Sequence, residues 1–82
     1  MPKLKDDLTQ FGKNYRVKPT YGARATKYVR MSGNTVLLEV QAETPQEANA
    51  EITSFMSGEL DHAVSVQSGL GDKEKTVYVS TR

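Results

Sequence analysis

The sequence predicts an α+β fold in which one main helix packs on one face of a mainly antiparallel four-stranded sheet. Two observations carry this prediction. Between Val36 and Ala42, the apolar residues Val36, Leu38, Val40 and Ala42 recur with the period of two expected for a strand with one buried face. From Thr44 to Gly58, apolar residues instead recur at the three- and four-residue spacing of an amphipathic helix. Such elements bury their apolar sides by packing together in layers.

The chain of 82 residues is long enough for one core, so we expect a single domain over residues 1–82. With no Cys and one His, we expect no disulfide, no metal site and no cofactor. No apolar run approaches the roughly 20 residues that span a bilayer, so we expect no membrane association. The charged N-terminus differs from a secretory signal, and this favours a cytoplasmic protein.

The N-terminal segment predicts a short amphipathic helix over Lys3–Phe11, too short to be stable without docking. Its apolar face comprises Leu4, Leu8 and Phe11. The next segment, Lys13–Gly22, is polar and basic and contains Pro19. Because proline cannot donate to a strand ladder, we predict a loop or an irregular edge strand there.

The stretch from Arg24 to Met31 alternates again and predicts a strand. We expect Val29 and Met31 on its buried face. The opposite, solvent-facing set is predicted to be Arg24, Thr26, Tyr28 and Arg30. Turn residues at 32–34 predict an antiparallel hairpin between this strand and Val36–Ala42.

The main helix has recognisable end signals. Thr44 and Glu47 have the spacing of a capping box, and Pro45 suits the first turn. Gly58 is predicted to end the helix as a left-handed C-cap. The apolar stripe of this helix comprises Ala48, Ile52, Phe55 and Met56.

The junction from Val40 to Ala48, with the pattern Ala-x-Thr-Pro-x-Glu-Ala, resembles one found in many small α+β domains. These include short proteins of phages and mobile elements. The resemblance implies a fold fragment and no particular activity.

Two further strands are predicted after the helix, over His62–Ser68 and Thr76–Thr81, joined by a turn-rich loop. In the last strand, Val77 and Val79 are expected to point inward and Tyr78 outward. The predicted element order is therefore α-β-β-α-β-β.

Charge is distributed unevenly along the chain. Residues 1–30 hold eight Lys or Arg against two Asp, a charge of 8 − 2 = +6. Residues 31–82 hold three against eight acids, 3 − 8 = −5, and the two halves sum to +1. The basic half favours a polyanionic partner.

We therefore predict a small, non-enzymatic nucleic-acid-binding accessory protein, of the kind that phages and mobile elements encode. Basic residues would neutralise phosphates and tyrosines would stack on bases. The predicted site residues are Lys13, Tyr15, Arg16, Lys18, Tyr21, Arg24, Lys27, Tyr28 and Arg30. Single-stranded DNA or RNA is favoured over a duplex, because no helix carries these residues into a groove. The alternative for the same residues is a solvated surface whose aliphatic stems cover the sheet.

A second hypothesis is a protein–protein interaction module, such as an inhibitor of a host protein or a subunit of an assembly. Acidic residues gather on and around the main helix: Glu43, Glu47, Glu51, Glu59 and Asp61. Such a face can engage a basic partner or the basic half of a second copy, giving a homo-oligomer. The alternative is a solvated helix face.

No enzymatic site is predicted. The glycine loop Gly69–Lys73 lacks the following helix and the spacing of a phosphate-binding loop, so a hairpin connection is expected. His62 lies near Asp61 and two serines, but nothing indicates an orienting group or an oxyanion site.

Overall fold

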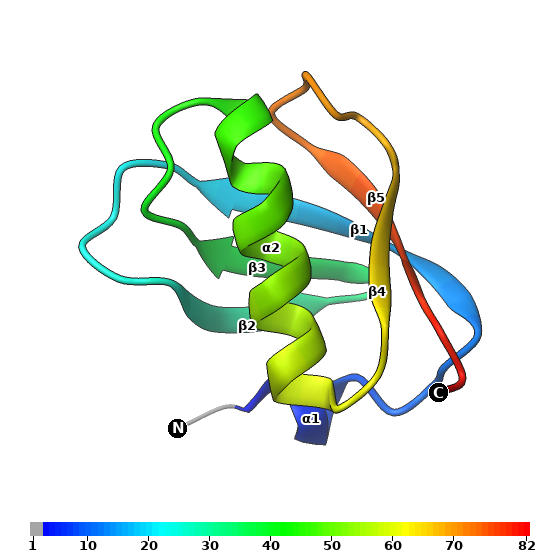
Figure 1. Cartoon of the computed structure of the whole chain (residues 1–82). Coiled ribbons are helices and arrows are strands. Elements are labelled where there is room, and N and C mark those ends of the chain that lie inside the picture. Colours follow the sequence, from blue (N-terminus) through cyan, green and yellow to red (C-terminus); the bar gives the residue numbers. More distant parts are fainter. Residues whose placement is uncertain (1–2) are drawn as a thin grey trace.

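The computed structural model describes residues 3–82. Its elements follow in the order α1 (Leu4–Asp7), β1 (Lys13–Thr20), β2 (Lys27–Ser32), β3 (Thr35–Glu39), α2 (Pro45–Leu60), β4 (Val64–Ser68) and β5 (Lys75–Val79). The strands form one sheet in the order β2-β3-β1-β5-β4, and α2 runs across it in Figure 1. The predicted α+β class, with one main helix and a short N-terminal helix, is confirmed.

The sheet has five strands rather than the predicted four, and it is mixed. β1 pairs with β3 in parallel, whereas the other three pairings are antiparallel. The strand that the prediction missed is β1, which lies at the centre of the sheet. The element order is accordingly α-β-β-β-α-β-β.

The prediction of a loop or edge strand over residues 13–22 was wrong because the basic side chains occupy only one side of β1. Tyr15, Val17 and Pro19 are buried, and the residues between them are exposed. This is an alternating strand whose outward positions happen to be charged. Charge alone therefore did not distinguish a loop from a half-buried central strand.

Pro19 is tolerated in this central strand because its nitrogen points where no partner lies. The N–H of Arg16 donates to the Asn34 carbonyl, so even-numbered residues of β1 direct their backbone groups toward β3. Successive residues alternate, so the Pro19 nitrogen faces the β5 side. Pairing with β5 extends along β1 only to Val17, so no ladder bond is lost.

The predicted hairpin between the next two strands is confirmed, since β2 and β3 pair antiparallel. Gly33 has φ +62° at the first central position of the two-residue turn, where a type II′ turn requires a positive angle. The last two predicted strands also form, as β4 and β5, within two residues of the predicted bounds at each end.

The strand β2 begins at Lys27 rather than at Arg24, and a bulge between Tyr28 and Arg30 changes its faces. A bulge inserts one residue, so side chains beyond it change sides relative to a regular strand. Tyr28 and Met31 consequently pack against the core, whereas Val29 is not part of it. The predicted solvent face, on which Tyr28 would accompany Arg30, does not form.

The helix α2 begins as predicted and ends later than predicted. The Thr44 hydroxyl accepts from the Glu47 N–H at 3.3 Å and donates to the Glu47 carboxylate at 2.7 Å. Gly58 lies inside the last turn. The C-cap is Asp61, in the left-handed conformation (φ 57°), and its N–H donates to the Ser57 carbonyl. Asp adopts this conformation more readily than most residues, so the glycine was not needed.

The core lies between α2 and one face of the sheet. The predicted helix stripe is confirmed, with Phe55 only half-buried and Leu60 added to it. The helix α1 is shorter than predicted, yet Leu4 and Leu8 are both buried. Phe11 lies outside the helix and stacks on the His62 ring, with centroids 3.8 Å apart.

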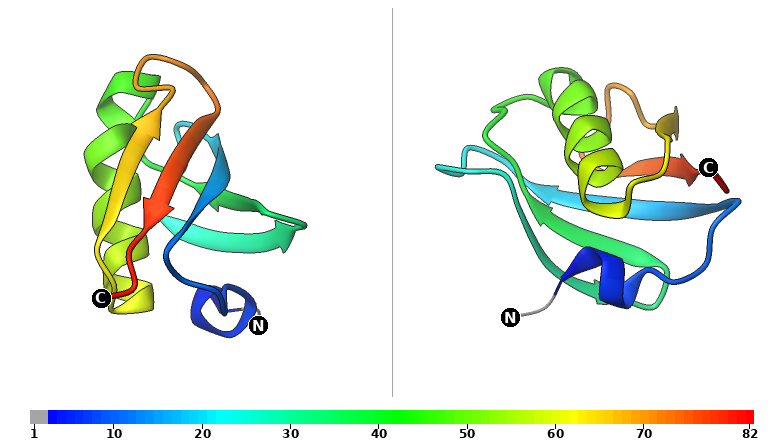
Figure 2. Two further views of the ribbon diagram at one scale, coloured as in Figure 1. Left: turned by 90° about the vertical axis from the view of Figure 1, so that its right-hand side faces the viewer. Right: turned by 60° about the horizontal axis from the view of Figure 1, so that its bottom comes forward.

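Both helices lie on the same side of the sheet. The Tyr28 hydroxyl, on the core side of β2, donates to the Asp7 carboxylate at 2.5 Å and ties α1 to this edge. The left panel of Figure 2 shows α2 beside one face of the sheet and no helix over the other. Within residues 3–82, the second sheet face is therefore open to solvent.

Candidate functional site

The open face is the side of the sheet directed away from α2. Strand alternation and cross-strand register assign its members: Asn14, Arg16, Lys18 and Thr20 of β1, Lys27, Arg30 and Ser32 of β2, Thr35, Leu37 and Glu39 of β3, Ser65 and Ser68 of β4, and Thr76 and Tyr78 of β5. Residues paired directly across a sheet point to the same face, so these side chains form one continuous surface.

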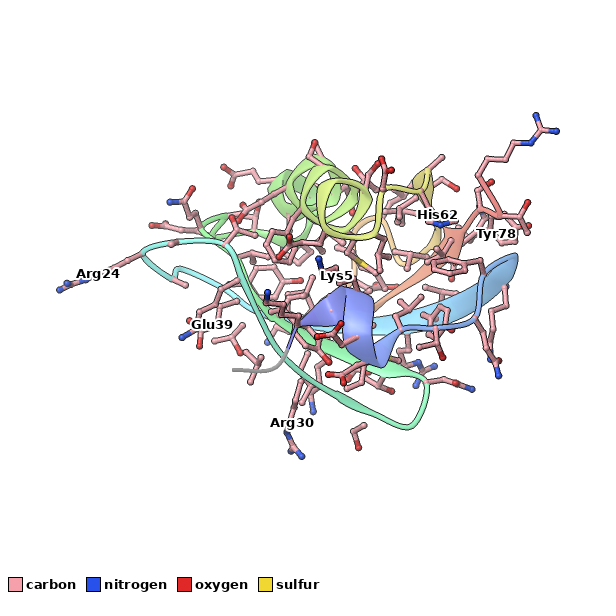
Figure 3. All side chains as sticks on the ribbon, turned by 90° about the horizontal axis from the view of Figure 1, so that it is seen from below. Lys5, Arg24, Arg30, Glu39, His62 and Tyr78 are labelled. Atoms are coloured by element: carbon pink, nitrogen blue, oxygen red, sulfur yellow. The ribbon has the colours of Figure 1, made fainter. Side chains whose placement is uncertain are left out.

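Four basic residues converge on this face. Arg30 of β2 pairs with Leu37 of β3, which in turn pairs with Lys18 of β1, so one row crosses three strands. Arg16 lies in the next row, and Lys27 lies at the far end of β2. Figure 3 shows Arg30 pointing away from α2, on the side opposite the helix. The two strands that flank β3 thus place four cations on one surface.

Two carboxylates accompany these cations. Glu39 shares the open face and pairs across from Lys27. Glu74, just before β5, lies 3.9 Å from Arg16 in the only ion pair found among residues 3–82. The Arg16 and Glu74 side chains are 65% and 49% exposed, so this contact is weak and leaves the guanidinium accessible. The open face retains an excess of positive charge.

The three tyrosines of the predicted site lie elsewhere, and each hydroxyl donates to the protein. Tyr15 is buried, and its hydroxyl donates to the Gln10 carbonyl at 2.8 Å. Tyr21 and Tyr28 pack against the core, and the Tyr21 hydroxyl donates to the Lys73 carbonyl at 2.7 Å. Burial raises the pKa of all three phenols above the usual 10.0. These rings are not arranged on the open face.

The remaining two predicted basic residues also lie off the open face. Lys13 pairs with Val79 on the core side of β1, and its ammonium lies 5.1 Å from the Tyr15 ring centroid. Arg24 projects from the loop between β1 and β2, well away from Arg30 in Figure 3. The structure therefore brings together four of the nine predicted site residues, Arg16, Lys18, Lys27 and Arg30.

The open face has an aromatic residue of its own that was not among the predicted site residues. Tyr78 of β5 is 37% exposed and pairs with Asn14 of β1. Its hydroxyl lies 3.8 Å from the position that a Cβ at Gly12 would take. The hydroxyl end of the ring is therefore directed toward Gly12, just before β1. The alternation of Val77, Tyr78 and Val79 was the sequence signal for this outward orientation.

The acidic residues of the second hypothesis are partly engaged within the protein. Glu51 accepts from the Thr26 hydroxyl at 2.5 Å and from the Gln41 and Ala42 N–H groups at 2.6 and 3.0 Å. Burial alone would raise the pKa of Glu51, but these hydrogen bonds outweigh it and lower the pKa. Glu47 is occupied at the helix cap. Glu51 therefore joins α2 to two neighbouring loops instead of facing solvent freely.

The glycine loop between β4 and β5 closes around a buried lysine. Lys75 is 1% exposed, and its ammonium donates to the carbonyls of Gly69, Leu70 and Asp72 at 2.8, 3.1 and 3.1 Å. Burial lowers the pKa of Lys75, and the nearby charge of Asp72 acts in the opposite direction. The loop turns carbonyl oxygens toward a cation, the reverse of the polarity that holds a phosphate.

The remaining candidate position is His62, which lies two residues before β4. Its Nδ1 lies 3.0 Å from the Ser80 carbonyl oxygen. No three His, Asp or Glu side chains within residues 3–82 gather closely enough to hold a metal ion. Neither helix in this part of the chain is long and apolar enough to cross a membrane.

A scan against protein-family models and searches of curated proteins and of solved structures found no match to this chain.

Proposed function

We propose that this protein binds nucleic acid through the open face of its sheet, as a non-enzymatic accessory factor. The observation that supports this most is the convergence of Arg16, Lys18, Lys27 and Arg30 on a surface that no helix of residues 3–82 covers. Lys and Arg side chains neutralise phosphates and release condensed counterions, which supplies most of the affinity of sequence-independent binding.

Single strands fit this surface better than duplexes. A duplex is read by an element that enters a groove, usually a helix or a two-stranded ribbon. The cations here lie on the broad face of a five-stranded sheet, and α2 is on the other side. A sheet face of this kind instead offers an extended platform along which an unpaired strand can lie.

A charge-reversal pair tests the proposal. Arg30→Glu changes the open face, and Lys5→Glu makes the same change of net charge on exposed residue 5 of α1, on the other side of the sheet. We expect wild type to retard labelled single-stranded oligonucleotides at low salt more than duplexes of equal length. Arg30→Glu should weaken this binding at least about tenfold, and Lys5→Glu should leave it nearly unchanged.

Absence of any retardation at micromolar wild-type protein would reject the proposal. Equal loss in the two variants would show a response to net charge alone, and this too would contradict a site on the open face. Circular dichroism of each variant verifies that the fold is retained.

The protein–protein hypothesis remains a prediction, with less support from the structure. Two of its five acidic residues, Glu47 and Glu51, are hydrogen-bonded within the protein. Light scattering over a range of concentrations measures self-association directly.

A further inference from the structure

The open face is divided along its width into a basic part and a neutral part. The cations lie on β1 and β2, on either side of β3. On β4 and β5, the members of the face are uncharged: Ser65, Ser68, Thr76 and Tyr78. The neutral part adjoins the basic part where β5 pairs with β1.

Arg16 and Tyr78 meet at the boundary between the two parts. Arg16 pairs directly with Thr76, and Tyr78 pairs directly with Asn14. Arg16 and Tyr78 are thus diagonal neighbours on adjacent strands, about 7–8 Å apart between Cα atoms. The Tyr78 hydroxyl is directed toward Gly12 and the Arg16 guanidinium toward Glu74, so the two side chains point apart along the sheet. They can therefore contact a base and a phosphate of neighbouring nucleotides in one strand.

The ring of Tyr78 is partly exposed to solvent. It is the most exposed of the four tyrosines, at 37%, and the hydroxyl end of its ring is directed toward Gly12. A ring lying along a sheet has one side against the protein and the other toward solvent. Aromatic side chains on open sheet faces hold unpaired bases in this way, and any base can stack on them.

We infer that Arg16, Asn14 and Tyr78 form a single-strand subsite in which Tyr78 stacks on one unpaired base while Arg16 neutralises the phosphate of a neighbouring nucleotide. This inference rests on the proposed function and adds a base contact to it. The subsite selects single strands, because a base inside a duplex cannot present its face to the ring. The Asn14 amide, which pairs across from Tyr78, can donate to and accept from a base edge.

The test compares two ligands that differ only in their bases. One is a labelled oligothymidylate of about 12 nucleotides, within the usual site size of single-strand binders, and the other is an abasic strand of equal length. Fluorescence anisotropy gives the Kd of wild type, Tyr78→Ala, Tyr78→Phe and Arg16→Ala for both. Tyr78→Ala should weaken oligothymidylate binding roughly tenfold and leave abasic binding unchanged. Tyr78→Phe keeps the ring and should bind both ligands like wild type.

Arg16→Ala should weaken binding of both ligands, since it removes a phosphate contact. Equal Kd values of wild type for the two ligands, or an equal effect of Tyr78→Ala on both, would overturn the inference and leave the electrostatic proposal standing. Failure of wild type to bind either ligand would overturn both.

Discussion

The change of binding affinity with salt concentration measures how many phosphates the open face neutralises. For single strands, the slope of log K against log salt concentration is about −0.7 for each neutralised phosphate. Arg16, Lys18, Lys27 and Arg30 share the face, so four contacts predict a slope of about −2.8. Between about 50 and 200 mM salt, this slope corresponds to a roughly fifty-fold loss of affinity.

Replacing Lys18 by alanine removes one contact from the middle of this set. Lys18 pairs with Leu37 and Thr20 follows it on the same face, so the truncation exposes no core residue. The slope should fall to about −2.1. Lys5→Ala, a matched lysine truncation on α1, should leave the slope at the wild-type value.

The assay is fluorescence anisotropy with a labelled oligothymidylate at four or more salt concentrations. A wild-type slope shallower than about −1 would refute the count of contacts, because it corresponds to hardly more than one phosphate. Identical slopes for Lys18→Ala and Lys5→Ala would refute the assignment of these contacts to the open face.

Three further predictions concern the stability of the fold, each measured by urea unfolding. Lys75→Met should cost about 2–4 kcal/mol, because three loop carbonyls lose their donor, whereas Lys73→Met, an exposed control, should cost almost nothing. The pKa of Glu51 is lowered, so its contribution is present above the usual value of 4.5 and is lost as pH falls through the lower folded value. Glu51→Gln should therefore be less stable than wild type near neutral pH by about 1–2 kcal/mol, and its free energy of unfolding should change less as the pH is lowered further. Parallel pH profiles of the two proteins would contradict this. Gly58→Ala should stabilise α2 by about 0.5–1 kcal/mol, since open space surrounds the added methyl group, and a loss of stability would show a hidden clash.

The parts of the fold that the sequence predicted are those with strong local signals. The α2 stripe and the Thr44 cap depend on residues close in sequence, as does the turn at Gly33. The central strand β1 was missed because its parallel partner β3 lies about 20 residues away along the chain. No short-range sequence pattern indicates this pairing. Pro19 added to the error, since its acceptability depends on where β5 stops pairing.

Only part of the candidate site could be predicted, because its other members come together through long-range strand pairing. Arg16 and Lys18 alternate with buried residues, so their common face follows once β1 is recognised as a strand. The position of Tyr28 could not be predicted, because a bulge reverses the alternation of β2 and its hydroxyl finds Asp7 on a distant element. Tyr78 joins the site only through the pairing of β5 with β1.

The central claim is that the open face of the sheet is the binding surface, and an NMR titration tests it most directly. Amide resonances of isotope-labelled protein would be followed while single-stranded oligonucleotide is added at low salt. The account predicts that the largest shifts fall on β1, β2 and β5, with α2 nearly unaffected. Shifts concentrated on α2, or none at all at saturating oligonucleotide, would contradict it.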